Sequence, residues 1–191
     1  GPIRLTAALL PVLEAQPHAA IMTVSSGLAF LPRASAPTYG ATKAAIHSYT
    51  QSLRYQLRDT SVQVLELIPP YVQTELTGPR QASDPNAMPL KDFIAEAMDI
   101  LKTSPDTTEV CVERVKPVRS AEAGGGYDGF YKNFNDTMSA ARDAGQRALG
   151  GVELLLISAS DDDRAAALKK LLRQFEADAA GSPGYQHGPV F

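Results

Sequence analysis

Three residues in the first quarter of the chain have the types and the spacing that proton transfer to an oxygen atom requires. Ser26 precedes Tyr39 by thirteen residues, and Lys43 follows Tyr39 by four. Residues four apart share one face of a helix, so the ammonium of Lys43 would lie one turn from the phenol of Tyr39. An ammonium in that place favours a phenolate, which lowers the pKa of a tyrosine from its ordinary value of about 10.

A tyrosine tuned in this way can exchange a proton with an alcohol or carbonyl oxygen near neutral pH. The hydroxyl of Ser26 could donate a hydrogen bond to the same oxygen as charge builds on it. We therefore predict catalytic roles for Ser26, Tyr39 and Lys43. The alternative is a surface tyrosine and lysine on an ordinary helix, with a serine in a nearby loop.

Another interpretation of the same region, a hydrolase that uses Ser26 and His47, is disfavoured. His47 lies one turn beyond Lys43 and could approach the site, but the residues around Ser26 do not form a nucleophile elbow. His47 is better explained as a polar helix residue. His18 and His187 fall in turn-like or tail segments and suggest no metal pair, so we expect no metal site.

The elements that would position these residues follow from the apolar pattern. Ala19–Ser25 is a short apolar run with β-branched members, typical of a strand buried on both faces. Gly27–Thr38 contains prolines and serines and predicts a loop, and an apolar stripe predicts a helix from Tyr39 to Arg58. Val62–Ile68 predicts a second strand. This order of strand, helix and strand predicts a right-handed crossover between parallel strands, and so an α/β fold.

The remaining segments up to Leu149 predict mostly helices. Thr77–Pro89 is rich in proline, glycine and polar residues and predicts a loop. Gly124–Gly126 predicts a helix stop, because it follows a helix rather than the strand that a phosphate-binding loop requires. The expected helices are Ile3–Ala15, Leu90–Lys102, Thr107–Ala123 with an interruption near Pro117, and Tyr127–Leu149.

The end of the chain carries a further strand and helix pattern. Val152–Ile157 predicts a strand, and Ser160 would cap a helix headed by Asp161–Asp163. Three carboxylates at a helix N-terminus complement the helix dipole. They could also suggest a metal site, but consecutive positions point in different directions around a helix, so dipole compensation is the better explanation.

Ser26, Tyr39 and Lys43, at these spacings and with a strand before them, resemble the catalytic set of the short-chain dehydrogenase/reductase family. The resemblance covers residues 1 to about 135. It implies a partial doubly wound, Rossmann-like parallel sheet that lacks the N-terminal nucleotide-binding strands. We therefore divide the chain into residues 1–135, the catalytic half of such a domain, and residues 136–191, a helix–strand–helix extension of unknown role.

By this resemblance, the protein would transfer a hydride between a nicotinamide cofactor, NAD or NADP, and a small alcohol or carbonyl substrate. Lys43 would bind the nicotinamide ribose, Val72 and Thr74 would touch the carboxamide, and Pro69 would shape the turn after the second strand. Pro70 stands where the family mostly has glycine, which we interpret as a subgroup trait. The implied cofactor-binding residues are Tyr39, Lys43, Pro69, Val72 and Thr74.

The resemblance also implies what this sequence lacks. The family's glycine-rich nucleotide loop and its proton-relaying asparagine have no counterpart here, and the abrupt start at Gly1 suggests the later part of a larger fold. A second hypothesis is therefore a catalytically silent, truncated remnant that acts as a dimerisation or interaction module. By the same resemblance, a homo-oligomer would form through the first helix and the helix that carries Tyr39.

Composition limits the class of partner. The formal net charge of −3 and the pI of about 5.6, without a basic cluster, argue against nucleic-acid binding. No apolar run approaches the roughly 18 residues that span a bilayer, and no signal peptide is visible, so we expect no membrane partner and a cytoplasmic location. The single cysteine, Cys111, rules out an internal disulfide and is expected to be a buried apolar residue rather than a nucleophile.

Overall fold

The computed structural model describes the backbone of residues 1–148 and the side chains of residues 1–140. One compact unit spans Gly1–Gly145, and a second begins at Gln146. The predicted strand at Val152–Ile157 and the helix after Ser160, with its three aspartates, lie outside the described residues. The predicted domain boundary at residue 135 falls within helix α6, Tyr127–Ala148.

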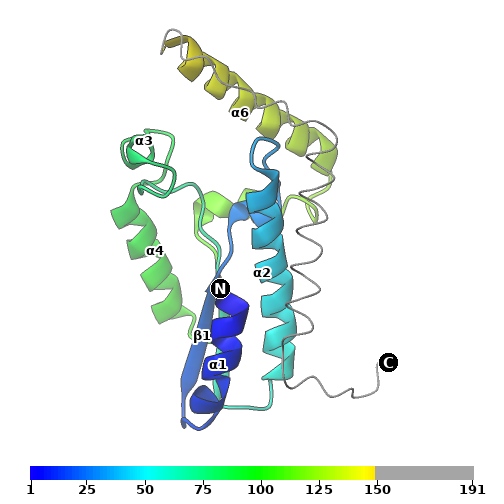
Figure 1. The fold of residues 1–191 in the computed structure, drawn as a ribbon, viewed down its shortest axis with the longest axis vertical. Coiled ribbons are helices and arrows are strands. Elements are labelled where there is room, and N and C mark those ends of the chain that lie inside the picture. Colours follow the sequence, from blue (N-terminus) through cyan, green and yellow to red (C-terminus); the bar gives the residue numbers. More distant parts are fainter. Residues whose placement is uncertain (149–191) are drawn as a thin grey trace, which may run out of the picture. The chain divides into compact units, whose positions relative to one another are not determined.

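Three parallel strands form the sheet of the first unit, in the order β1-β2-β3. β1 is Ala19–Val24, β2 is Val62–Leu67 and β3 is Glu109–Val110. β1 and β2 are paired along their whole length, and β3 pairs with the last two residues of β2. The parallel pairing confirms the predicted α/β fold and agrees with a partial Rossmann-like sheet (Figure 1).

Helices α1, Pro2–Glu14, and α2, Pro37–Gln56, pack on one face of this sheet. Each helix has a proline at its first position, where the missing N–H costs no hydrogen bond, and α2 therefore starts two residues before the predicted Tyr39. The buried members of the cluster on this face are Leu53, Leu57, Val62 and Val64, and the half-buried side chains packed against them are Leu10, Leu13, Ala19, Ile21 and Tyr49.

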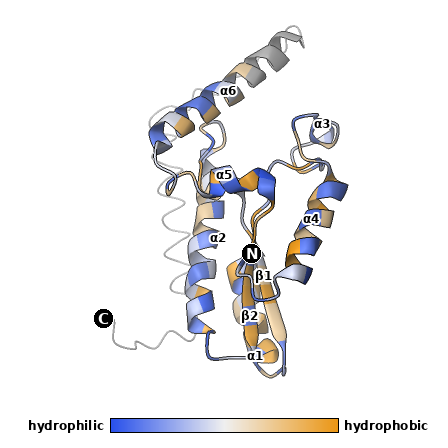
Figure 2. Ribbon diagram, turned by 180° about the vertical axis from the view of Figure 1, so that it is seen from behind, coloured by the Kyte–Doolittle hydropathy of each residue, from blue (hydrophilic) through white to orange (hydrophobic). Residues whose placement is uncertain are grey.

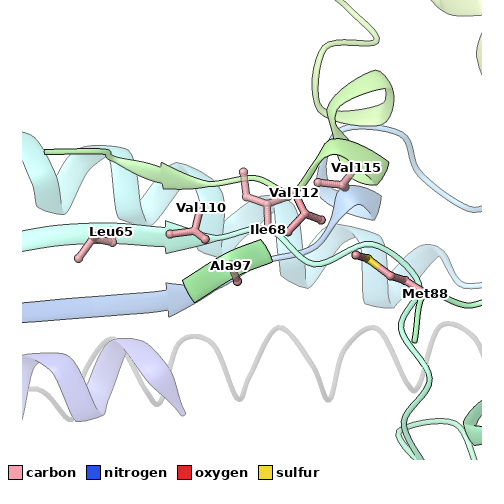
Figure 3. Close-up of a cluster of buried hydrophobic side chains, with 7 residues drawn as sticks. All are labelled: Leu65, Ile68, Met88, Ala97, Val110, Val112 and Val115. Atoms are coloured by element: carbon pink, nitrogen blue, oxygen red, sulfur yellow. The ribbon is translucent and has the colours of Figure 1, made fainter. Parts of the chain in front are cut away.

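Helix α4, Leu90–Thr103, contributes to the cluster on the other face. Figure 2 shows hydrophobic colour along β1 and β2, as expected for parallel strands that lie between helices. The second cluster joins α4 to β2, to β3 and to the segment after β3, and Figure 3 draws its buried side chains. They are Leu65, Ile68, Met88, Ala97, Val110, Val112 and Val115.

The predicted helix over Thr107–Ala123 is wrong for most of its length. The segment instead contains β3, the 3₁₀ turn η2 at Glu113–Val115 and the short helix α5 at Lys116–Arg119. Val110 lies opposite Leu67 in the sheet and is fully buried. Pairing with β2 and burial of a β-branched side chain therefore outweigh the local helical pattern.

The connecting segments hold the remaining short elements. The 3₁₀ turn η1 is Gly27–Ala29, and helix α3, Pro79–Ala82, lies within the predicted loop before α4. Gly125 and Gly126, between α5 and α6, have φ angles of +73° and +69°, which glycine adopts without strain. Among residues 1–148, the helices are too short or too polar to cross a membrane.

Candidate active site

Ser26 lies just past the carboxyl end of β1, the edge at which ligands bind in open α/β sheets. The pairing of β1 with β2 continues beyond the strands, because the Gly27 N–H donates to the Pro69 carbonyl at 3.1 Å. The Oγ of Ser26 accepts a hydrogen bond from the Leu28 N–H at 3.2 Å. Since this bond uses a lone pair, the hydroxyl proton of Ser26 remains available to a substrate oxygen.

Lys43 contacts both the strand that leads to Ser26 and the ring of Tyr39. Its Nζ donates to the Val24 carbonyl at 2.9 Å, two residues before Ser26, and lies 5.6 Å from the centroid of the Tyr39 ring. The structure therefore brings the tyrosine–lysine pair to the strand end that carries the serine. Burial lowers the pKa of Lys43, because the ammonium has lost part of its hydration.

Tyr39 lies in the first turn of α2 and is 38% exposed. The next residue, Gly40, allows this turn to approach η1 closely, since a Cβ at Gly40 would lie 3.2 Å from the Leu28 carbonyl oxygen. The Leu28 N–H also donates to Ser26 Oγ, so the same turn of backbone contacts the predicted catalytic serine and the residue that follows Tyr39. No hydrogen bond joins Tyr39 to Ser26 within residues 1–140, which leaves the phenol open to a ligand.

The predicted cofactor residues Pro69, Val72 and Thr74 follow β2 and fall into two groups. The carbonyl of Pro69 accepts a hydrogen bond from the Gly27 N–H of η1, so Pro69 lies beside the predicted catalytic serine. Val72 is buried and forms a parallel bridge with Met88. The Oγ1 of Thr74 accepts a hydrogen bond from Nε2 of Gln81 at 3.0 Å. The structure thus brings Pro69 to the predicted catalytic serine, while Val72 and Thr74 contact other residues of the loop before α4.

A buried histidine–glutamate pair lies one turn along α2 from Lys43. Nδ1 of His47 lies 2.8 and 3.1 Å from the two carboxylate oxygens of Glu66, whose side chain is fully buried in β2. The ring of His47 also meets the ring of Phe30 edge-on, with centroids 4.6 Å apart. We predicted His47 as a polar helix residue and did not identify its partner. A single carboxylate inside the apolar run of β2 was the available signal.

An arginine–glutamate ion pair lies against this histidine–glutamate pair. Arg119 donates from Nε and Nη2 to the two carboxylate oxygens of Glu109, both at 2.8 Å, and its guanidinium lies 4.4 Å from the Phe30 ring centroid. These bonds lower the pKa of Glu109. Potential ligand atoms of His47, Glu66 and Glu109 lie within 4.8 Å of one another. Because Arg119 already occupies both oxygens of Glu109, the guanidinium supplies the positive charge that a metal ion would otherwise bring.

Cys111 is half-buried between β3 and η2. Burial raises the pKa of its thiol, which disfavours the reactive thiolate. The environment is the one expected for a packing residue rather than a nucleophile.

A family model described as short chain dehydrogenase matches residues 1–85. Over these residues, the chain belongs to the short chain dehydrogenase family. The matched part includes Ser26, Tyr39, Lys43 and Thr74, and the predicted family is confirmed. The end of the resemblance near residue 135 stays a prediction.

Two curated relatives of this chain are uncharacterized bacterial oxidoreductases. The chain is 41% identical over 138 residues to the uncharacterized oxidoreductase DltE of Bacillus subtilis. This match covers 71% of the present chain and 54% of the relative. It is 33% identical over 118 residues to an uncharacterized oxidoreductase of Staphylococcus epidermidis, which covers 62% of this chain and 51% of the relative. The chain therefore spans about half the length of the curated relatives that it matches.

Solved structures of dehydrogenases share the fold. A short chain dehydrogenase from Burkholderia cenocepacia in complex with NADP has a TM-score of 0.57 at 22% identity, covering 69% of this chain and 54% of that one. A short-chain dehydrogenase from Sphingobium yanoikuyae in complex with NADPH has a TM-score of 0.51 at 22% identity, covering 84% of this chain and 56% of that one. At these identities the likeness shows the fold of the described unit.

Proposed function

We propose that the protein is an NAD(P)-dependent oxidoreductase that interconverts an alcohol and a carbonyl group on a small substrate, and that it works in the cytoplasm. The single observation that carries the proposal is the position of Lys43. Its ammonium bridges the strand end that carries Ser26 and the ring of Tyr39. Such a cation stabilises a phenolate, which is the form that accepts a proton from an alcohol.

In the proposed mechanism, Tyr39 holds the proton that moves. Its hydroxyl gives that proton to a carbonyl oxygen in reduction and takes it back from the alcohol in oxidation. Ser26 donates its free hydroxyl hydrogen to the same oxygen and stabilises the negative charge there. Lys43 stays charged beside the ring of Tyr39 and keeps its remaining N–H donors for a ribose hydroxyl.

The residues present fit the nicotinamide end of such a cofactor. Lys43 donates to one carbonyl among the described residues and so has donors to spare, and Thr74 offers a hydroxyl on the loop after β2. When bound, the nicotinamide would supply or accept the hydride. We propose that the cofactor is NAD or NADP. The complexes of the two solved dehydrogenases with NADP and NADPH support a nicotinamide cofactor.

The decisive experiment compares Tyr39→Phe with Tyr55→Phe in the full-length protein. Both tyrosines lie on α2, but Tyr55 is 69% exposed near the far end of the helix, so it controls for the loss of a phenol hydroxyl. We expect Tyr39→Phe to lower kcat at least 100-fold, since general acid–base catalysis contributes about 10²–10⁴-fold, while Tyr55→Phe keeps the activity. Turnover of NADPH and NADH with a panel of ketones and aldehydes is the readout. Full activity of Tyr39→Phe would remove Tyr39 from the mechanism.

A second candidate function is association with another copy of the chain, and the surface of α1 favours it. Four large apolar side chains of this helix are exposed, between 46% and 62%. They are Ile3, Leu5, Leu9 and Val12. We infer a homo-oligomer that buries α1 and the neighbouring part of α2, tested by light scattering of the wild type and of Leu5→Asp. A monomeric wild type would exclude this candidate.

A further inference from the structure

The loop between β2 and α4 is tied to itself at its base. The Met88 N–H donates to the Tyr71 carbonyl and the Gln73 N–H donates to the Met88 carbonyl, both at 2.8 Å. Val72, between them, forms the parallel bridge with Met88. Backbone hydrogen bonds alone therefore hold together the two ends of the segment that contains Thr74.

Gln81, in α3, fills the inside of this loop. It is 5% exposed, and its side-chain amide makes four hydrogen bonds. Nε2 donates to the Val72 carbonyl at 2.8 Å and to Thr74 Oγ1 at 3.0 Å. Oε1 accepts from the Thr77 N–H at 3.0 Å and from the Thr77 hydroxyl at 2.6 Å. Every donor and acceptor site of the amide is thus used within one loop.

Chemistry fixes the orientation of this amide. The Thr77 N–H can only donate, so the group facing it must be the oxygen of Gln81. The Val72 carbonyl can only accept, so the group facing it must be the nitrogen. A flipped amide would place two donors together at one end and two acceptors together at the other. The Thr77 N–H and the Val72 carbonyl are therefore compatible with only one orientation of the Gln81 amide.

This orientation decides what the hydroxyl of Thr74 can offer. Because Nε2 of Gln81 is a donor, Thr74 Oγ1 accepts from it, and the Leu76 N–H approaches the same oxygen at 3.4 Å. Both lone pairs of a hydroxyl are then engaged. The proton of Thr74 is left to point away from the loop interior, toward an acceptor that the described residues do not supply.

We propose that Gln81 is a positioning residue that makes Thr74 a hydrogen-bond donor toward an acceptor oxygen of the bound dinucleotide. The proposal rests on the proposed function and deepens it. It assigns the direction of one hydrogen bond to the cofactor: the Thr74 hydroxyl donates and a ligand oxygen accepts. Gln81 itself does not touch the ligand and acts through Thr74 and the Val72 carbonyl.

The test is the substitution Gln81→Glu in the full-length protein, with NADPH and NADH affinity measured by titration calorimetry. A carboxylate has no donor, so the Thr74 hydroxyl would turn inward to donate to it, and the ligand would lose its donor. We expect Kd to rise about 10-fold at pH 8, the value of one hydrogen bond of about 1.4 kcal/mol. At pH 5 the difference from wild type should shrink, because a protonated carboxyl regains a donor. Gln63→Glu, whose amide donates to the Pro105 carbonyl at 2.7 Å, controls for the added charge.

A double-mutant cycle separates positioning from simple loop damage. If Gln81 acts through Thr74, Gln81→Glu should weaken binding no further in a Thr74→Val background. Additive losses would overturn the proposal, as would an equal loss in Gln63→Glu or an unchanged Kd in Gln81→Glu. Should Gln81→Glu fail to fold, Thr77→Val takes its place, because it removes the 2.6 Å anchor of the amide from an exposed position and should raise Kd about threefold.

The outcomes also separate this proposal from the proposed function. If the wild-type protein binds neither NADPH nor NADH, the oxidoreductase function fails and the role of Gln81 fails with it. If the wild type binds and Tyr39→Phe abolishes turnover, but Gln81→Glu binds as the wild type does, only the role of Gln81 is refuted.

Discussion

Replacing His47 with leucine should destabilise the protein strongly, because it leaves the buried carboxylate of Glu66 alone. Within residues 1–140, the His47 ring is the one hydrogen-bond partner of that carboxylate, whose side chain is fully buried. Removing one member of a buried pair costs about 3–5 kcal/mol. A natural domain has only about 5–15 kcal/mol of stability, so this single change would remove a large share of it.

One feature of the structure places the expected cost near the lower end of that range. Arg119 lies close enough to Glu66 for the two charges to attract each other, so some compensation remains. We therefore expect a loss of about 3 kcal/mol at pH 7.

Urea unfolding followed by circular dichroism would measure the loss, with Glu66→Leu and the double variant completing the cycle. Glu66→Leu should cost less, about 1 kcal/mol, because His47 is 17% exposed and can keep water as a partner. The double variant should be more stable than His47→Leu alone, since an apolar pair of similar volume replaces the buried polar pair. A loss below 1 kcal/mol in His47→Leu, or strictly additive losses, would refute this account of the pair.

Three further predictions follow from close contacts and pKa shifts. Gly27→Ala should lower stability by about 2 kcal/mol in thermal unfolding, because the new Cβ would lie 2.8 Å from Cγ2 of Val115. Arg119→Met should lower stability by about 1 kcal/mol at pH 7. Because Arg119 lowers the pKa of Glu109, the pair stabilises above about pH 4.5, and the gap between variant and wild type should close in urea titrations at lower pH. Burial lowers the pKa of Lys43, so cofactor affinity should fall on the alkaline side before pH 10.5, and NADPH titrations from pH 7 to 10 test this.

The elements that carry the candidate site could be predicted from sequence because their signals are local. Ala19–Val24 and Val62–Leu67 are apolar runs of strand length, and the stripe of α2 has helical period. The spacing of Tyr39 and Lys43 placed them on one helical face, and the structure agrees. The catalytic and cofactor roles of these residues stay predictions until the variants above are measured.

What the sequence could not provide depends on contacts between distant residues. β3 is only two residues long, and nothing within it distinguishes a strand from a helix until β2 lies beside it. The His47–Glu66 pair joins residues nineteen apart, and its meaning depends on burial rather than on spacing. The same holds for Gln81, which looks like any glutamine in a polar loop until Val72 and Thr74 fold over it.

The backbone bonds between Tyr71 and Met88 should let the loop between them accept insertions. Its base is fastened by backbone bonds, so extra residues at the exposed Ser83 need not disturb β2 or α4. Each doubling of the length of a flexible loop adds only about 0.6 kcal/mol of closure entropy. Evolution or protein engineering could therefore change the exposed surface of this loop while the hydrogen bonds of the Gln81 amide and the sheet remain unchanged.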